Sequence, residues 1–224
     1  GAYMEPWAQK LIEGLDGDVQ VVDVSAHVPL EEESHDHEGH DHDGHGGFDP
    51  HIWTNPQNAK VMVDNIAAAL SAADPAGSGL FMTNAADYKA QLDELDETIM
   101  EIVGMSEHRE IVFGGRFAMR YFAEHYGLAW SAAFDSCSGE TEPSVRAVAQ
   151  IVDNIQKNRI PVIYYEELTD PKVARAIARE SGAQPLLLHS CHNVSKDELA
   201  AGATYLSLME QNAVNLKRGL NGWR

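Results

Sequence analysis

The sequence lacks three features that would place it quickly in a class of proteins. It has no run of about 18 apolar residues, so no segment is expected to span a membrane as a helix. Basic residues are few, 16 against 35 acidic ones, and the net charge of −19 excludes a protein that binds along a phosphate backbone. Residues 1–10 have neither a basic start nor an apolar core, so either processing removed a signal peptide or the sequence was trimmed.

Cysteine is also scarce. Cys137 and Cys191 are the only two, and an even pair permits one disulfide without requiring it. Ligation of a metal by the two thiols is the alternative. What the chain does contain is apolar residues, 44% of 224, which suffice for a substantial core in one large domain or two lobes.

The most unusual segment covers residues 31–47 and combines five histidines with seven carboxylates. Neutral imidazole ligates metals, and the carboxylates raise the local concentration of divalent cations. Mixed nitrogen and oxygen ligands suit Zn²⁺ better than Mg²⁺ or Ca²⁺, which prefer oxygen alone. Because apolar anchoring residues are missing, we expect this segment to be a mobile collector of metal. Its histidines are His35, His37, His40, His42 and His45.

The first part of the chain predicts mainly helices. We expect a short helix over residues 4–14 and a buried strand over 19–25. Asn55 and Pro56 are typical of a helix start. A longer helix over residues 84–103 has apolar residues at spacings of three and four, and it is the natural connector of two lobes.

The second part alternates strands with helices, which predicts an α/β fold with a parallel, doubly wound sheet. The expected strands cover residues 110–115, 128–134, 161–167 and 185–189. The expected helices cover residues 117–126, 143–158, 171–181 and 195–216.

Ligands of such sheets bind at the carboxyl ends of the strands, and two of these ends carry metal-ligating side chains. His189 and His192 follow the last strand, while Glu166 and Glu167 follow the strand before it. His51 lies in a turn that contains a proline, next to the His-rich segment. A single histidine is more often a core or cap residue than a ligand, and for His51 the two readings have equal weight on the residues alone.

Besides the His-rich segment, five segments of the chain carry a resemblance to a known family. They are DPHIWTNP, GGRFAMRYFAEHYGL, SGETEPS, IPVIYYEELTDPKVARAIARESGA and GATYLSLMEQNAVNLKRGL. Together they resemble the cluster A-I metal-binding proteins of bacterial ABC importers, and the His-rich segment is typical of the zinc branch. The resemblance implies two lobes of parallel-sheet βα units, joined by a long rigid connecting helix, with a metal between the lobes.

The resemblance also implies a biological role. Such a protein is not an enzyme, lies outside the cytoplasm in the periplasm or on a lipid anchor, and delivers its ion to a membrane permease. Zn²⁺ is the expected cargo and Mn²⁺ the alternative, because cells select metals by availability as well as by ligand type.

The resemblance divides the chain into an amino-terminal lobe (1–83), a connecting helix (84–107) and a carboxy-terminal lobe (108–224). The segment around Trp7 resembles one that lies much further along in the family. The first lobe is therefore expected to be incomplete, without the opening βα units and their histidine ligand. An incomplete sheet would have an exposed edge, through which copies of the chain could associate.

The resemblance also suggests a metal site. His51 matches the histidine of the family's Asp-Pro-His motif, whereas Arg116 stands where the family has a ligand. Arginine cannot ligate, and we expect it to form an ion pair in the cleft, with Glu167 as one candidate partner. His192 is the expected replacement ligand, with His189 as the second choice and Glu166 as a carboxylate ligand.

Three alternatives remain open at this point. The chain could be a repurposed relative without a tight metal site, as Arg116 and the incomplete first lobe suggest. It could be a zinc hydrolase in which Glu166 or Glu167 activates water, although no HExxH motif supports this. Cys137 and Cys191 could form a disulfide, or join His51 and His192 in a closed site that would release zinc poorly.

Overall fold

The computed structural model of the chain describes residues 6–15, 17, 19–31, 48–134 and 143–221. The chain divides into two compact units, residues 1–93 and 94–224. The boundary lies inside a long helix, α3. None of the helices in the described ranges is long and apolar enough to cross a membrane.

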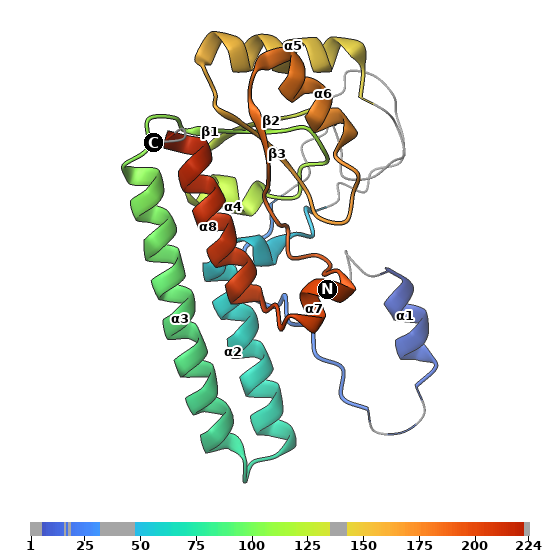
Figure 1. Cartoon of the computed structure of the whole chain (residues 1–224). Helices are drawn as coiled ribbons and strands as arrows, with labels where there is room; N and C mark the ends of the chain where they lie inside the picture. Colours follow the sequence, from blue (N-terminus) through green and yellow to red (C-terminus); the bar gives the residue numbers. More distant parts are fainter. Residues whose placement is uncertain (1–5, 16, 18, 32–47, 135–142, 222–224) are drawn as a thin grey trace. The chain divides into compact units, whose positions relative to one another are not determined.

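The first unit is built on two long helices (Figure 1). α2 covers Pro56–Ala73, and α3 covers Ser78–Gly104 and continues into the second unit. Within the first unit, Lys60 Nζ lies 2.5 Å from Asp93 Oδ1, so an ion pair joins the two helices. Because this pair is partly exposed, we expect it to contribute little to stability.

α2 begins as predicted, since the Asn55 side chain accepts a hydrogen bond of 2.9 Å from the Gln57 N–H and a proline follows the cap. α3 begins earlier than predicted, at Ser78 instead of residue 84. Its first turns place Leu80 and Met82 on the surface, 63% and 50% exposed. Apolar spacing therefore contained no signal for these turns.

Ahead of α2 the unit contains α1 (Pro6–Glu13), as predicted, and then an extended segment instead of the strand predicted over residues 19–25. Val19 is 54% exposed, and Asp23 accepts hydrogen bonds from both the N–H and the hydroxyl of Ser25. A strand needs a neighbour that satisfies its backbone hydrogen bonds, and the described residues of this unit provide none here. The prediction of a strand was wrong for that reason.

The second unit contains a four-stranded parallel sheet with the order β2-β1-β3-β4. Phe113 at the end of β1 is in register with Ala132 of β2 and with Tyr164 of β3. The predicted α/β class with a parallel sheet is therefore confirmed. The strands are β1 (Glu110–Phe113), β2 (Ala129–Ala132), β3 (Val162–Tyr165) and β4 (Gln184–Leu187).

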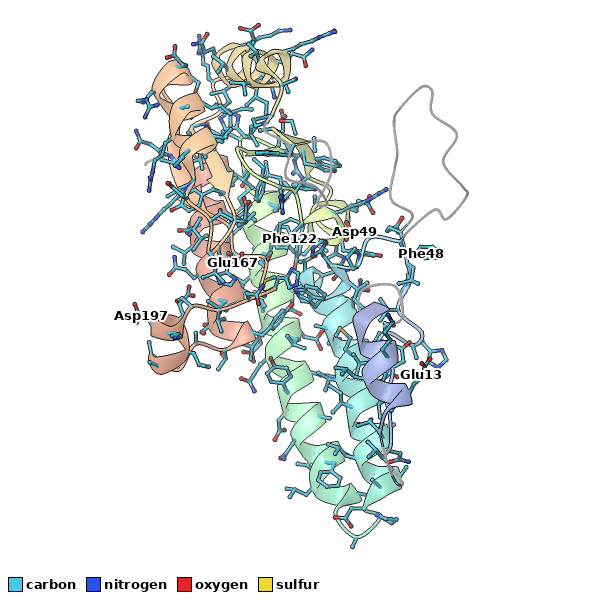
Figure 2. The ribbon with its side chains drawn as sticks, turned by 90° about the vertical axis from the view of Figure 1, so that its right-hand side faces the viewer. Glu13, Phe48, Asp49, Phe122, Glu167 and Asp197 are labelled. Atoms are coloured by element: carbon cyan, nitrogen blue, oxygen red, sulfur yellow. The ribbon has the colours of Figure 1, made fainter. Side chains whose placement is uncertain are left out.

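Helices cover both faces of this sheet (Figure 1). Val112 of β1 belongs to the apolar cluster with α5 and α6, whereas its neighbours Ile111 and Phe113 belong to the cluster with α4, α8 and the last part of α3. Phe122, labelled in Figure 2, is fully buried in the second cluster. Alternation along the strand thus fills two cores. The helices are α4 (Arg120–His125), α5 (Val145–Asn158), α6 (Lys172–Ser181) and α8 (Tyr205–Asn221).

The helix predicted over residues 195–216 is two helices, α7 (Lys196–Ala200) and α8. Gly202 between them has a φ of +81°, which ends α7 in a conformation that favours glycine. A new cap follows at once, because the Ser207 N–H donates to Thr204 Oγ1 at 3.2 Å. The apolar pattern runs through both helices and gave no sign of this break.

Candidate metal centre

His51 lies in a tight turn that a single carboxylate organises. Asp49 Oδ1 accepts one hydrogen bond from the His51 N–H at 2.8 Å and is also 2.8 Å from His51 Nδ1. Both side chains are buried, 7% and 8% exposed. A carboxylate is only an acceptor, so a neutral imidazole in this position carries its proton on Nδ1 and its lone pair on Nε2. This is the tautomer that a metal-binding histidine needs.

The turn around His51 is fixed by further hydrogen bonds. The Thr54 hydroxyl donates to the His51 carbonyl at 2.8 Å, and Asn58 Nδ2 donates to the Ile52 carbonyl at 3.1 Å. The short 3-10 helix Ile52–Thr54 then leads into α2. These hydrogen bonds restrict the movement of the turn and its imidazole, so the direction of the ring is set before any ligand arrives.

The described residues that flank the His-rich segment meet at the backbone of Asp49. The Asp49 N–H donates to the Glu31 carbonyl at 3.0 Å, which joins the two flanks of the segment. Residues 32–47, with the five histidines predicted to collect metal, lie outside the described residues. Figure 2 labels Asp49 and its neighbour Phe48 at the point where the described chain resumes.

His189 in the second unit follows β4 and is held by an asparagine of α8. The His189 N–H donates to Asn212 Oδ1 at 2.7 Å, and Asn212 Nδ2 donates to the His189 carbonyl at 2.7 Å. Both residues are buried, 2% and 1% exposed. The amide thus pairs with the backbone of His189 as a neighbouring strand would, and extends the order of the sheet beyond β4.

The imidazole of His189 has a buried nitrogen without a hydrogen bond. Nδ1 accepts a hydrogen bond from the Cys191 N–H at 2.9 Å, so the neutral ring carries its proton on Nε2. Nε2 is buried and has no hydrogen-bond partner among the described residues, and Glu198 Oε1 lies 3.7 Å away. On the other side of the ring, Glu167 Oε2 lies 3.8 Å from Nδ1.

Glu167 organises the loop that carries His189. Its carboxylate accepts hydrogen bonds from the N–H and the hydroxyl of Ser190 at 2.8 and 2.6 Å, and from the Asn193 N–H at 3.4 Å. Burial alone would raise its pKa, but the Ser190 hydrogen bonds and the imidazole of His189 outweigh burial and lower it. The carboxylate therefore belongs to this loop, whereas the sequence had suggested an ion pair with Arg116.

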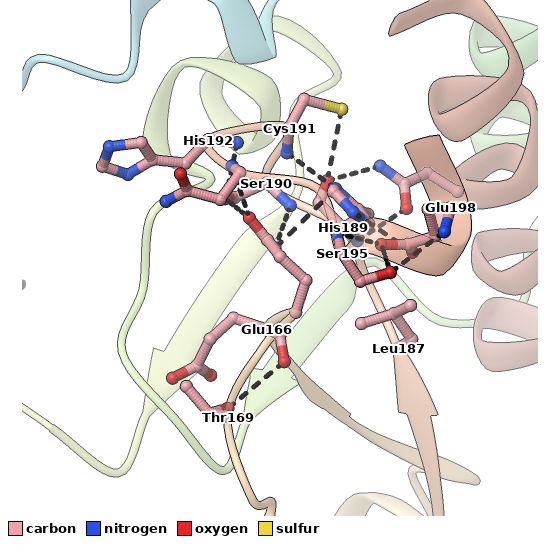
Figure 3. Close-up of polar contacts among 12 residues, drawn as sticks. Glu166, Thr169, Leu187, His189, Ser190, Cys191, His192, Ser195 and Glu198 are labelled. Carbon is pink, nitrogen blue, oxygen red and sulfur yellow. Dashed lines mark hydrogen bonds and ion pairs between the residues drawn. The ribbon is translucent and has the colours of Figure 1, made fainter. Parts of the chain in front are cut away.

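Glu166 points away from that loop (Figure 3). Its Oε1 accepts a long hydrogen bond of 3.4 Å from the Arg116 N–H, and its Oε2 is buried without a hydrogen-bond partner among the described residues. The carboxyl group lies so close to Gly115 that a Cβ there would be 1.8 Å from Oε2. Neighbouring acids that looked equivalent in sequence thus have different surroundings.

The remaining candidates lie in the His189 loop. His192 is exposed, and its N–H donates to the Ser190 hydroxyl at 3.2 Å. Cys191 adopts a φ of +59°, and burial together with Glu167 raises its thiol pKa to about 12. Cys137 lies outside the described residues, so the disulfide and the thiol ligation both stay predictions.

Within the described ranges, no three side chains of the metal-ligating types are gathered into one group. The predicted ligands instead each have different neighbours and hydrogen-bond partners. The residues that sequence reasoning missed are the orienting ones, Asp49, Ser190 and Asn212. Asp49 had a usable signal, because an aspartate two residues before a histidine can accept from the histidine backbone and ring together.

Comparison with known proteins gives the family context. The profile of the family described as zinc-uptake complex component A, periplasmic (ZnuA), matches residues 1–219. The high-affinity zinc uptake system protein ZnuA of Bacillus subtilis (strain 168) is 33% identical over 223 residues, which cover 97% of this chain and 69% of that protein.

A second relative is longer. The zinc-binding lipoprotein AdcA of Streptococcus pneumoniae (strain ATCC BAA-255 / R6) is 33% identical over 221 residues, which cover 96% of this chain but 44% of AdcA. The chain thus spans less than half the length of this relative. The solved Zn(II)-bound ZnuA-like domain of Streptococcus pneumoniae AdcA superposes with a TM-score of 0.78 at 29% identity, covering 99% of this chain and 78% of that one.

Proposed function

The chain belongs to the family of periplasmic zinc-uptake complex component A proteins, and we propose that it captures Zn²⁺ outside the cytoplasmic membrane and delivers it to the permease of an ABC importer. Its relatives are named for zinc binding and zinc uptake, and the AdcA relative is named a lipoprotein. The site of action we propose is therefore the periplasm or the outer side of the membrane. Mn²⁺ is a competing cargo to be tested.

The observation that carries this proposal is the buried pair of His51 and Asp49. The 2.8 Å contact between Nδ1 and the carboxylate directs the Nε2 lone pair outward from the pair and holds the ring in one orientation. Zn²⁺ binds such nitrogens at about 2.0 to 2.1 Å. We therefore assign His51 as the ligand of the first unit.

In the second unit we propose His189 before His192, which reverses the order that the sequence favoured. Burial of Nε2 without a hydrogen-bond partner leaves a polar atom that a ligand would satisfy. Binding requires the proton to move from Nε2 to Nδ1, where it breaks the hydrogen bond from the Cys191 N–H and has Glu167 as the available acceptor. His192 remains a candidate on sequence grounds, whereas Glu166 points away from the His189 loop and we do not propose it as a ligand.

The role we propose is capture and release without covalent chemistry. A carrier needs an exchangeable ion, and a histidine that must change its tautomer before it ligates binds the ion less tightly than one already in the ligating tautomer. The family is one of transport components, which agrees with this role. Turnover of an ester or peptide by the zinc-loaded protein, lost in Glu166→Gln, would support a hydrolase in its place.

Titration of the metal-free chain with Zn²⁺ in competition with a chromophoric chelator tests the proposal. We expect one tightly bound ion and additional weakly bound ions. Deletion of residues 32–47 should remove the weak ions and keep the tight one, and the same titration with Mn²⁺ ranks the two metals. Loss of all tight binding in the deleted chain would identify it as a relative without a tight site.

A further inference from the structure

The second unit contains a cavity of about 650 Å³ that the zinc function does not use. It opens at the carboxyl ends of β1 and β3, where parallel sheets bind their ligands. The volume is within the range of sites for small organic molecules, and far larger than a metal ion requires. The cavity lies entirely within residues 114–176.

One wall of the cavity carries the carboxyl group of Glu166. As described above, its Oε2 is buried and has no hydrogen-bond partner among the described residues, while Oε1 has only the long contact with the Arg116 N–H. A buried carboxyl oxygen without a donor is costly. A ligand that brings a charged N–H donor to this wall would remove the cost, and an ammonium group is the simplest such donor.

Other parts of the wall carry positive charge. Arg116 follows β1, and Lys172 opens α6, a helix of ten residues that begins without a side-chain cap. Lys172 Nζ lies 3.6 Å from Asp170 Oδ2 and is 81% exposed, so it can turn toward an anion at little cost. Guanidinium and ammonium groups favour a carboxylate, and an uncapped helix start adds to the attraction.

Between these charged walls the lining is largely apolar. Most of its larger apolar members come from the ends of the strands and the first turns of α6, and one precedes α5. They are Phe134, Pro143, Tyr165, Pro171, Val173 and Ala176.

We propose that this cavity binds a free α-amino acid with an apolar side chain. The ammonium group would pair with Glu166, the carboxylate would face Arg116 and Lys172, and the side chain would pack on the apolar lining. The proposal does not depend on zinc binding, because neither of the two proposed zinc ligands, His51 and His189, lines the cavity.

Isothermal titration of the metal-free full chain with three matched probes tests the proposal. L-phenylalanine has both charges, 2-phenylethylamine lacks the carboxylate, and 3-phenylpropionate lacks the ammonium group. We expect L-phenylalanine to bind at least roughly tenfold more tightly than either of the others. Equal affinities for the three probes, or no heat with any of them, would overturn the proposal.

Glu166→Gln then identifies the group that receives the ammonium. It should weaken L-phenylalanine roughly tenfold and leave 3-phenylpropionate unchanged. The control is Glu180→Gln, an exposed acid on the same α6, which should change neither. An unchanged affinity for L-phenylalanine in Glu166→Gln would contradict the assignment.

Two further measurements on Glu166→Gln separate this proposal from other roles of the residue. Its melting temperature should equal or exceed that of the parent, because a carboxyl group without a partner has been removed. Its affinity for zinc should be retained. A variant that loses zinc but keeps L-phenylalanine would make Glu166 a metal ligand and end the amino-acid proposal, whereas loss of both through unfolding would make it structural and do the same.

Discussion

Two buried histidines of the chain are each accompanied by a carboxylate, yet they are prepared for different tasks. His51 donates its Nδ1 proton to Asp49 across 2.8 Å, so its Nε2 carries a lone pair. His189 accepts at Nδ1 from the Cys191 N–H, and Glu167 lies 3.8 Å away. The first ring is ready to ligate, whereas the second must first move its proton. Both histidines are buried, so the difference between them comes from the distance of Nδ1 to the nearby carboxylate oxygen, which is 2.8 Å in His51 and 3.8 Å in His189.

Removal of the His51 imidazole should have the largest effect, and the quantity affected is the affinity for zinc. His51→Ala is expected to lower the affinity for zinc by roughly a hundredfold or more, since even the partners of ligating histidines are worth 10- to 100-fold. Chelator competition measures the change. His108→Ala, a histidine outside both sites, is the matched control. Equal affinities of the two variants would place the tight ion elsewhere.

The orienting carboxylate of His51 should come second. Asp49→Ala is expected to weaken zinc binding by about 10- to 100-fold, because the imidazole loses its proton acceptor and its fixed direction. Asp49→Asn keeps an acceptor oxygen and should lose less. The order of these two variants is the informative result, and an Asn variant that is no better than Ala would show that charge alone matters.

On the other side of the comparison, Glu167 should act mainly on the stability of its loop. In Glu167→Gln an NH₂ group faces the hydrogen-bond donors of the loop, and we expect a loss of about 2 kcal/mol in unfolding free energy at pH 7. Chemical denaturation of the variant beside Glu210→Gln, an exposed acid of α8, measures it.

The pH dependence of that loss follows from the lowered pKa of Glu167. A carboxyl group with a lowered native pKa contributes stability above its ordinary pKa of 4.5, and this contribution disappears as the pH falls through the native value. The gap between parent and Glu167→Gln should therefore be full at pH 7 and shrink below about pH 4.5. A gap that does not change with pH would contradict the hydrogen-bonded carboxylate.

The smallest effect concerns one hydrogen bond of the loop. Ser190→Ala removes the 2.6 Å hydrogen bond from the hydroxyl to Glu167, and we expect a loss of about 1.5 kcal/mol in unfolding free energy. The Glu167 pKa should rise toward its ordinary value, which NMR titration of the carboxyl carbon measures. A full-sized loss without a shift in this pKa would point to packing instead.

Much of this arrangement could be predicted from the sequence, and the parts that could not have physical reasons. The four parallel strands and the cap at Asn55 follow from apolar runs and local hydrogen bonding, which neighbouring residues determine. The strand at residues 19–25 failed because a strand depends on a partner that its own sequence does not contain.

The candidate metal centre also has one part that the sequence predicted and another that it could not. The sequence could select His51 from a local motif, but the tautomer of His189 depends on contacts with Cys191 within its loop and with Glu167 and Asn212 from other elements. Glu166 and Glu167 look alike in sequence, and only the fold shows that one serves the loop and the other the cavity. Side-chain direction over long separations was therefore the missing information.

Before zinc arrives, His51 has the tautomer that ligates and His189 does not. Long-range ¹H–¹⁵N NMR of the histidine rings in the metal-free chain reports the tautomer of each directly. We predict a proton on Nδ1 of His51 and on Nε2 of His189, with zinc shifting the Nε2 signals of both rings and moving the His189 proton to Nδ1. A proton on Nε2 of His51 in the metal-free chain, or a His51 ring unaffected by zinc, would contradict this prediction.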